Sequence, residues 1–269
     1  MSSRVTLISD DMTNFGAFGL GSQLAEPDLP PMLSGRRTID GRSALDAAIE
    51  GAVSMTLGAG DLLWRDDPTV ADIAIILEPD VSLAKASQLL PMTMVAVGDC
   101  VGALTPPQVG VLFRWPCHIL INAAAAGRVR LVAGTGDPSA VPRWLVVGVE
   151  LRLRHQAGAL EPGHDREHTS LAEEGCEELT NIELIESCSR HFLTWLNIWQ
   201  DDGFRSVHDS WLNRADGRQE AIAVEGIEHP VTVTGLDEDG NLLVKDRSGV
   251  VSARALLDGV TVVDDNSSS

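Results

Sequence analysis

The chain alternates between segments whose apolar residues recur every three or four positions and short runs rich in β-branched residues. The first spacing is typical of helices and the second of strands. Helices are predicted to begin at Ser43, at Leu83 and at Thr180, with a short fourth helix over residues 207–214. The expected strands cover residues 72–78, 109–114, 118–122, 128–133 and 144–151. Because the last of these begins apolar on both faces, we expect it to lie at the centre of a sheet.

The clearest predicted helix follows Thr180. Thr180 and Glu183 match a capping box, in which each residue bonds the backbone N–H of the other. The apolar residues that follow form one stripe, at Ile185, Cys188, Phe192, Trp195 and Trp199. Gly203 is expected to end this helix. Earlier in the chain, we expect Gly58–Gly60 to stop the helix from Ser43, and a polar loop to run from Asp61 to Thr69.

After Gly217 the pattern changes to short alternating strands separated by turn residues. Residues 231–245 are expected to form a hairpin around an Asp-Gly turn. Strands near Val250 and over residues 260–263 would complete a small β-domain. The sequence therefore predicts a flexible leader at 1–27, a main domain at 28–216, a small β-domain at 217–264 and a tail at 265–269.

The charge of the chain is strongly negative, with 39 acidic against 20 basic residues and a formal net charge of −19. Such a surface repels phosphate backbones, so we expect no nucleic-acid partner. Basic residues gather only at Arg36-Arg37 and in a spaced series at Arg128, Arg130, Arg143, Arg152 and Arg154. We interpret the series as charge scattered along strand edges rather than a binding groove.

Neither the cysteines nor the ends of the chain indicate a special environment. The four cysteines are widely spaced and the seven histidines show no helical His-x-x-x-His pair, so no metal site is predicted. No apolar run approaches the roughly 20 residues that cross a bilayer, and the first residues do not match a signal peptide. The expected location is the cytoplasm, without membrane contact.

A Trp-Pro segment carries the most informative motif. Residues 111–122 place Trp115-Pro116 between two short apolar runs, and Ala123–Ala126 and Gly127-Arg128 follow. This segment resembles the Lys-Trp-Pro-Asn-Asp segment of biotin protein ligases, in which a lysine follows the second strand. Three further segments resemble the same ligases in the same order, namely Val147–Leu151, Thr169–Gly175 and Gly235–Val244.

Over residues 29–264 the chain resembles a divergent member of the biotin/lipoate protein ligase family. The resemblance implies an α+β fold, in which a mixed sheet with flanking helices precedes a small SH3-like β-barrel. It also implies a chemistry: such ligases join biotin to ATP, release pyrophosphate and pass the acyl group to a carrier-domain lysine. Biotin, lipoate and ATP are therefore the candidate cofactors, and a biotinyl or lipoyl carrier domain is the candidate partner.

Residues that the resemblance leads us to expect for that reaction are missing. The glycine- and arginine-rich loop of the family is replaced by Gly60–Pro68, in which Arg65 is the single arginine among three aspartates. Ala125 falls at the lysine position, and the only lysines of the chain are Lys85 and Lys245. Bringing a carboxylate against a triphosphate requires fixed positive charge. We therefore expect these aspartates to repel ATP.

The sequence thus favours a ligase-like protein that binds a biotin- or lipoate-type acid, its acyl-adenylate or a carrier protein without normal adenylation. No catalytic residue is assigned. The expected ligand-binding residues are Ser43, Trp64, Arg65, Arg114, Trp115, Asn122, Gly127 and Arg128. The alternative is an active but divergent ligase, in which Arg65 and Arg128 contact the phosphates.

Two further hypotheses remain open. Cys117 beside His118 suggests cysteine acyl transfer, as in the octanoyltransferases of this fold, but neighbours on a strand point to opposite faces. A repressor role is not expected, because the 27-residue leader is too short for a winged helix. The small β-domain suits closure over the cleft or contact with a protein, and a strand edge could mediate a homodimer.

Overall fold

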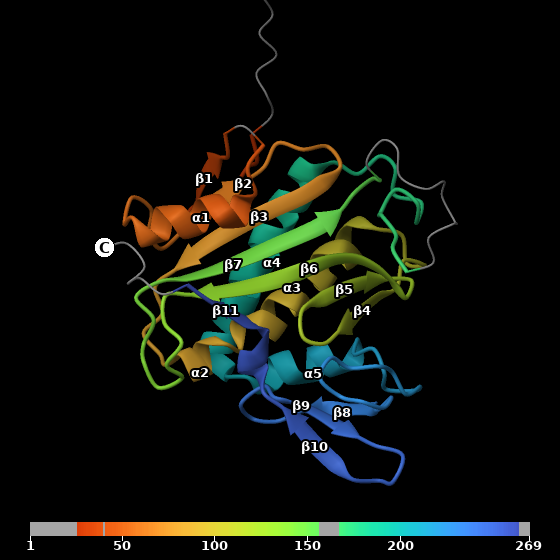
Figure 1. Ribbon diagram of the computed structural model, residues 1–269. Coiled ribbons are helices and arrows are strands. Elements are labelled where there is room, and N and C mark those ends of the chain that lie inside the picture. Colours follow the sequence, from red (N-terminus) through yellow and green to blue (C-terminus); the bar gives the residue numbers. More distant parts are fainter. Residues whose placement is uncertain (1–25, 40, 156–166, 264–269) are drawn as a thin grey trace, which may run out of the picture.

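The computed structural model describes residues 26–39, 41–155 and 167–263. The tail expected at 265–269 and nearly all of the leader expected at 1–27 lie outside this part of the chain. The described residues form a mixed α+β structure, with one large sheet, flanking helices and a small antiparallel sheet near the C-terminus (Figure 1). The predicted fold class is confirmed in this form.

The large sheet is mixed and has β7 (Leu145–Arg152) at its centre, as the apolar pattern predicted. Strand order is β1-β2-β3-β7-β6-β5-β4, with β11 beside β6. The pairs β1–β2 and β11–β6 are parallel and the others antiparallel. The other strands are β1 (Ser34–Arg37), β2 (Asp61–Trp64), β3 (Val70–Leu77), β4 (Val111–Arg114), β5 (His118–Ile121), β6 (Ala124–Ala133) and β11 (Val260–Val262).

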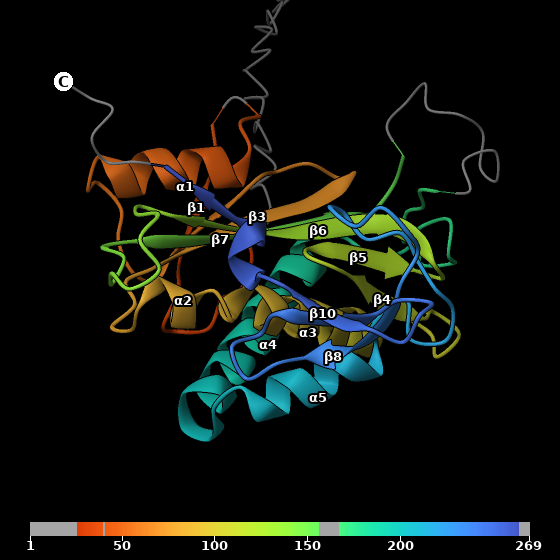
Figure 2. The ribbon, with the colours of Figure 1, turned by 60° about the horizontal axis from the view of Figure 1, so that its bottom comes forward.

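The two faces of this sheet are covered to different extents. Figure 2 shows α1 (Ala44–Val53) on one side, and α3 (Leu89–Leu104), α4 (Asn181–Asp202) and α5 (Arg205–Asn213) on the other. The larger core lies between the sheet and α3 and α4. On the α1 side a smaller core joins that helix to Leu63, Ala74, Ile76, Val132, Trp144 and Val146. Helix α1 therefore covers only one end of its face.

Helix α3 is apolar on nearly all sides, and twelve of its sixteen residues are buried. Together with the short α2 (Leu83–Ala86), it forms the segment Leu83–Leu104, which is long and apolar enough to cross a membrane by length and composition alone. Of its most apolar window, 78% is buried inside the protein. Its composition is that of a helix enclosed by a sheet on one side and by α4 on the other.

Helix α4 begins as the sequence predicted. The Thr180 side chain accepts a hydrogen bond from the Glu183 N–H, and the Glu183 carboxylate accepts one from the Thr180 N–H at 2.9 Å. Ile185, Cys188 and Phe192 of the apolar stripe are buried. Gly203 ends the helix with a φ of 75°, a left-handed conformation that glycine adopts without strain.

The expected polar loop from Asp61 to Thr69 is wrong in its first four residues, which form β2. Leu62, Leu63 and Trp64 are buried, because this strand lies between β1 and β3 with apolar layers on both faces. The pattern there is a continuous apolar run, which is typical of a strand that is buried on both sides.

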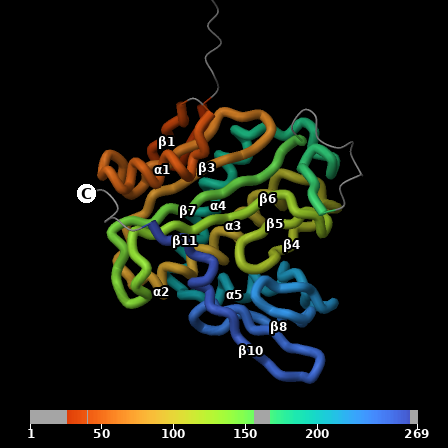
Figure 3. The backbone as a smooth tube through the Cα atoms, in the orientation of Figure 1, coloured from red at the N-terminus to blue at the C-terminus, as the bar shows by residue number. Residues whose placement is uncertain are grey.

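The small sheet contains β8 (Thr232–Leu236), β9 (Leu242–Lys245) and β10 (Val251–Arg254), and the predicted hairpin is its β8–β9 pair. The fourth strand expected at 260–263 does not join it. Instead β11 leaves through a 3₁₀ turn at Leu256–Gly259 and pairs in parallel with β6. Figure 3 shows this last segment running from the small sheet back onto the large one. The chain is thus tied to the main sheet after the small sheet has formed.

We predict that Thr180→Ala lowers the free energy of unfolding by about 1 kcal/mol, because the N–H of Glu183 loses its cap. Urea denaturation monitored by circular dichroism measures this change. Thr194→Ala is the matched control: Thr194 lies on the same helix and bonds only the Arg190 carbonyl one turn earlier. Its replacement should leave stability nearly unchanged. An equal loss in both variants would contradict the capping role.

Candidate functional site

The part of the sheet that α1 leaves uncovered carries charged side chains. Along β6, Val129 and Leu131 are buried in the larger core, whereas Arg128 and Arg130 alternate with them in sequence and point to the other face. Along β7, Leu151 is likewise buried, while the residues on either side of it, Glu150 and Arg152, are only partly buried. The period of two therefore places these charges together on one open surface.

Strand register brings these charges into one row. Asp72 of β3 is opposite Glu150 of β7, and Glu150 is opposite Arg128 of β6. Arg128 is in turn opposite His118 of β5, which is opposite Arg114 of β4. Directly opposed residues of neighbouring strands share a face and lie about 5 Å apart. The row therefore crosses five strands of the sheet.

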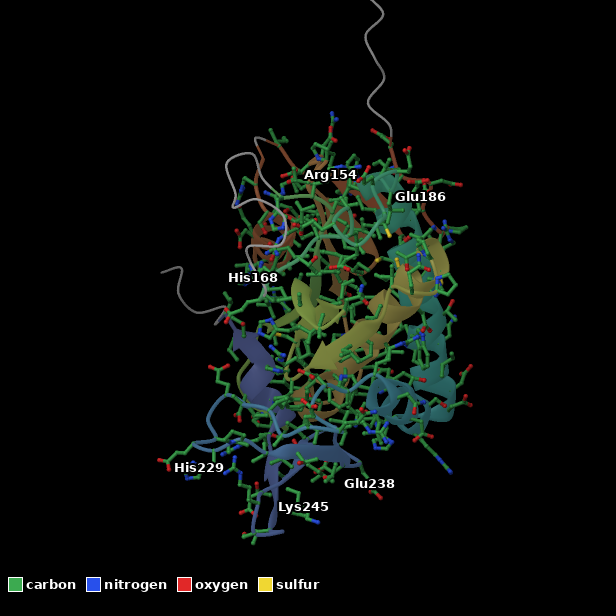
Figure 4. The ribbon with its side chains drawn as sticks, turned by 90° about the vertical axis from the view of Figure 1, so that its right-hand side faces the viewer. Arg154, His168, Glu186, His229, Glu238 and Lys245 are labelled. Atoms are coloured by element: carbon green, nitrogen blue, oxygen red, sulfur yellow. The ribbon has the colours of Figure 1, made fainter. Side chains whose placement is uncertain are left out.

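A pocket of about 670 Å³ opens over the middle of this row. Its lining is dominated by cationic and histidine side chains, with one carboxylate. The lining residues are Arg65, Thr69, Val70, His118, Ala125, Ala126, Gly127, Arg128, Glu150, Arg152, Arg154, His155 and His168. Figure 4 shows Arg154 and His168 at the end of the molecule away from Glu238 and Lys245 of the small-sheet region. No residue of the small sheet lines the pocket.

Three arginines at the site are balanced by carboxylates. Arg65 lies 3.0 Å from Asp72, in an ionic contact that lacks hydrogen-bond geometry, and 3.8 Å from Asp67. Glu150 receives Arg128 at 2.7 Å and Arg130 at 3.3 Å. Arg65, Arg128 and Arg130 thus meet three carboxylates, so this set contributes little net charge to the pocket.

Two other arginines contact only neutral backbone carbonyls in the described part of the chain. Arg152 Nη1 donates to the carbonyl oxygens of Ala125 at 3.3 Å and Thr169 at 3.1 Å. Arg154 donates to the carbonyls of Pro68, Glu177 and Leu179. A carbonyl orients a guanidinium without cancelling its charge. Arg152 and Arg154 therefore supply the surplus positive charge of the pocket.

Two groups in the row have shifted pKa values. Burial raises the pKa of Asp72, while the Ala44 N–H and the Arg65 charge oppose that rise. Loss of hydration lowers the pKa of His118, and the charges of Arg114 and Arg128 lower it further. At neutral pH we therefore expect His118 to be an uncharged hydrogen-bonding group.

Of the eight residues predicted from the sequence, the structure brings Arg65, Gly127 and Arg128 into the pocket. Gly127 is constrained by the neighbouring strand, because a Cβ there would lie 2.4 Å from the Glu150 carbonyl oxygen. Such an approach is far below contact distance, so the strands could not pair in this way with a side chain at 127. Whether these residues bind a ligand stays a prediction.

Two of the remaining residues are close to the site but outside its lining. Trp64 is 2% exposed and lies in the core between the sheet and the helices, not in an exposed loop over a cleft. Ser43 precedes α1 and makes no side-chain cap; its buried Oγ has no hydrogen-bond partner among the described residues. The carboxylate of Asp72 accepts the first N–H of that helix instead.

The other three predicted residues have structural contacts. Arg114 Nε donates to Asp216 at 2.7 Å, which fixes β4 to the segment after α5. Trp115 is 8% exposed and packs edge-on against Trp211 at 6.3 Å, next to a cis Pro116. Asn122 lies in the turn between β5 and β6, where its side chain hydrogen-bonds Gly110 and Glu174. None of the three lines the pocket.

The role of the spaced arginine series was not predicted. Arg128, Arg152 and Arg154 were interpreted as scattered strand-edge charge, but all three line one pocket. Part of the signal was present, because Arg128 and Arg130 are two apart in a predicted strand and therefore share a face, whereas Arg152 and Arg154 follow the end of the predicted strand 144–151. Of the three aspartates expected to flank the site, Asp61 pairs with Arg36 and Asp66 with Arg37. Asp67 accepts a hydrogen bond from Thr69 and remains 3.8 Å from Arg65 of the pocket.

Cysteine chemistry finds little support at this site. Burial raises the pKa of the Cys117 thiol, which disfavours the thiolate that a nucleophile requires. His118 lies in the pocket lining and Cys117 does not. No cluster of three potential metal ligands is found within residues 26–39, 41–155 and 167–263.

Comparison with known proteins gives one consistent result. The model of the biotin/lipoate A/B protein ligase family matches residues 29–213. A biotin–[acetyl-CoA-carboxylase] ligase of Paracoccus denitrificans is 24% identical over 177 residues, which are 65% of this chain and 73% of that protein. The bifunctional ligase/repressor BirA of Bacillus spizizenii is 24% identical over 181 residues, 66% of this chain and only about half (54%) of its own length.

Solved structures agree on the fold. A biotin protein ligase-like protein of unknown function from Silicibacter is 33% identical, with a TM-score of 0.78 over 88% of this chain and 100% of that one. The biotin protein ligase of Aquifex aeolicus, at 16% identity, has a TM-score of 0.64 over 79% of this chain and 91% of that one. At that identity the second likeness shows the fold alone.

We predict that His118→Gln reduces the loss of stability on acidification. Because the folded pKa of His118 is lowered, the unfolded chain binds a proton as pH falls through about 6.5 while the folded protein does not. Stability is therefore lost as pH falls through this range. Urea unfolding at pH 7.5 and 5.5 measures the difference.

His229→Gln is the control for this experiment, because His229 is exposed outside the pocket. It should retain the pH dependence of the parent protein. Identical pH dependence in His118→Gln and the parent would contradict the expectation.

Proposed function

This chain belongs to the biotin/lipoate A/B protein ligase family, and from that premise we propose that its pocket binds a biotin- or lipoate-type acid or the corresponding acyl-adenylate. In this proposal the protein does not carry out the usual ATP-dependent adenylation. It holds the acid or its activated form, on its own or together with a carrier domain. The pocket over β6 and β7 is the binding site.

The observation that carries this proposal is the small charge surplus of the pocket. Arg65, Arg128 and Arg130 are already opposed by carboxylates at 2.7–3.8 Å, which leaves Arg152 and Arg154 as the uncompensated cations. A carboxylate or an acyl-adenylate carries a single negative charge, which this surplus can accommodate. A triphosphate brings several charges that must all be stabilised in the transition state. The surplus is better matched to the first kind of ligand.

The residues around Ala125 support the same conclusion. Ala125 lies in the lining at the position where the resemblance leads us to expect a lysine, and neither Lys85 nor Lys245 lines the pocket. Removing one such group from a transition state typically costs on the order of 10²–10³ in rate. With the phosphate contacts Arg65 and Arg128 also engaged by Asp72 and Glu150, adenylation would be slow.

The alternative function is an active, divergent ligase that attaches the cofactor to a carrier-domain lysine. One observation favours it: four arginines line the pocket of a chain whose net charge is −19. If an incoming nucleotide displaced Asp72 or Glu150 from its arginine partner, more positive charge would become available. The two functions differ in whether pyrophosphate is released.

The partner proposed for this function is a biotinyl or lipoyl carrier domain. The curated relatives are named as ligases, and one name includes its target, acetyl-CoA carboxylase. Because the small sheet contributes nothing to the pocket lining, it is available to contact such a domain. The cytoplasmic location, a homodimer and the SH3-like character of the small domain stay predictions.

We predict that biotin, lipoate or biotinyl-5′-AMP stabilises the protein against heat, whereas ATP alone does not. A ligand at a hundredfold excess over its dissociation constant should add about 2.7 kcal/mol of stability. In a parallel assay with ATP and biotin or lipoate, pyrophosphate release should not exceed the rate without protein. Thermal denaturation and a coupled pyrophosphate assay measure the two results.

Two outcomes would count against the proposal in different ways. Acid-dependent pyrophosphate release would support the divergent ligase instead. If no acid and no adenylate shifts the thermal transition, the proposal of small-molecule binding is rejected. Docking of a carrier domain would then be the remaining proposal, and a titration with a biotinyl or lipoyl domain tests it.

A further inference from the structure

The arginines of the pocket differ in how many of their donors are engaged. A guanidinium has five N–H donors, and the edge formed by Nε and Nη2 suits two oxygens of one oxyanion. Arg154 is bonded through both Nη1 and Nη2 to three carbonyls that join the β2–β3 turn to the segment before α4. It therefore acts mainly as a structural cross-link.

Arg152 is held in a different way. Only Nη1 is used, for the carbonyls of Ala125 and Thr169. Its Nε and Nη2 make no hydrogen bond, and no carboxylate lies within ion-pair distance, among the residues that the structure describes. Two carbonyls thus fix the orientation of the guanidinium, and Arg152, which lines the pocket, retains donors that no described residue uses.

Arg152 lies beside Ala125, the position at which the resemblance leads us to expect a lysine. Its Nη1 reaches the backbone of Ala125, so a cation from β7 lies beside the start of β6. Ala125 also contributes to the lining, and its small side chain leaves space that a longer residue would fill. The cation that the resemblance leads us to expect at position 125 is therefore replaced in space by an arginine of the next strand.

We propose that Arg152 is the oxyanion-binding residue of this pocket and receives two oxygens of the ligand's charged group through Nε and Nη2. The inference rests on the proposed function, because it specifies how the acid or adenylate is held. The shared chemistry is a singly charged oxyanion. Its two sources are the carboxylate of a free acid and the phosphoryl group of an acyl-adenylate, which the following experiment distinguishes.

The first experiment compares the full-length parent with Arg152→Ala, using calorimetric titration with biotin and lipoate in one arm and biotinyl-5′-AMP in the other. The substitution removes a charge-assisted hydrogen-bonded pair, so the affinity for the ligand that Arg152 contacts should fall about ten- to hundredfold. If only binding of the adenylate is weakened, Arg152 binds its phosphoryl group; if binding of the free acids is weakened, Arg152 binds the carboxylate. Unchanged affinity for all ligands would overturn the assignment.

A matched control and a rescue separate binding from structure. Arg143→Ala removes an exposed arginine that is absent from the pocket lining and from its charge balance, so affinity should change little. In the Ala125→Lys/Arg152→Ala double variant, a lysine on β6 restores a cation beside the same position and should recover part of the lost affinity. If Arg152 acted only by bracing the carbonyls of Ala125 and Thr169, the added lysine would recover none.

A second measurement tests Arg152 even if no acyl ligand binds. Phenylglyoxal modifies arginines with accessible donors, and peptide mass spectrometry identifies the modified sites. Inorganic phosphate should protect Arg152 and leave the exposed Arg143 unprotected. Protection by phosphate without binding of any acid or adenylate would support the oxyanion site and reject the proposed function. Lack of protection by phosphate, by acids and by the adenylate would reject the Arg152 assignment itself.

Discussion

The site exists because the helices cover the two faces of the main sheet unequally. Strands alternate their side chains between faces, so every buried residue of β6 and β7 on the α3–α4 side is followed by one on the other side. Helix α1 encloses only one end of that second face. Apolar residues beyond it would be exposed, and Arg128, Glu150 and Arg152 occupy those positions instead. The charged pocket follows from this incomplete layer.

Local patterns in the sequence were sufficient for much of the fold. The capping box at Thr180, the central position of β7 and the hairpin of β8 and β9 each depend on residues that are near one another in the chain. By contrast, β2 is a three-residue apolar run between charges, and β11 pairs with a strand far away in sequence. Short strands acquire their identity from their neighbours in space, which local periodicity does not contain.

The site was less predictable for a related reason. Resemblance to the ligases indicated Arg65, Gly127 and Arg128, which do line the pocket. The importance of Arg152 depends on the register between β6 and β7 and on a hydrogen bond to Ala125, and neither is visible in the sequence. A side chain that compensates for a missing residue from another strand is detected only when the two strands are aligned in space.

Local and global electrostatics act on a ligand at different distances. The net charge of −19 opposes the approach of any polyanion, with an effect that decays over about 8 Å at physiological ionic strength. At contact, the uncompensated guanidiniums of Arg152 and Arg154 dominate, because their carbonyl partners are neutral. A single oxyanion is repelled only weakly on approach, and its attraction to the two guanidiniums in the pocket offsets that repulsion. A triphosphate meets a larger repulsion and finds its additional charges opposed by carboxylates that already occupy Arg65 and Arg128. The proposed selection for a singly charged acid or acyl-adenylate thus depends on the charge of the whole chain together with that of its pocket.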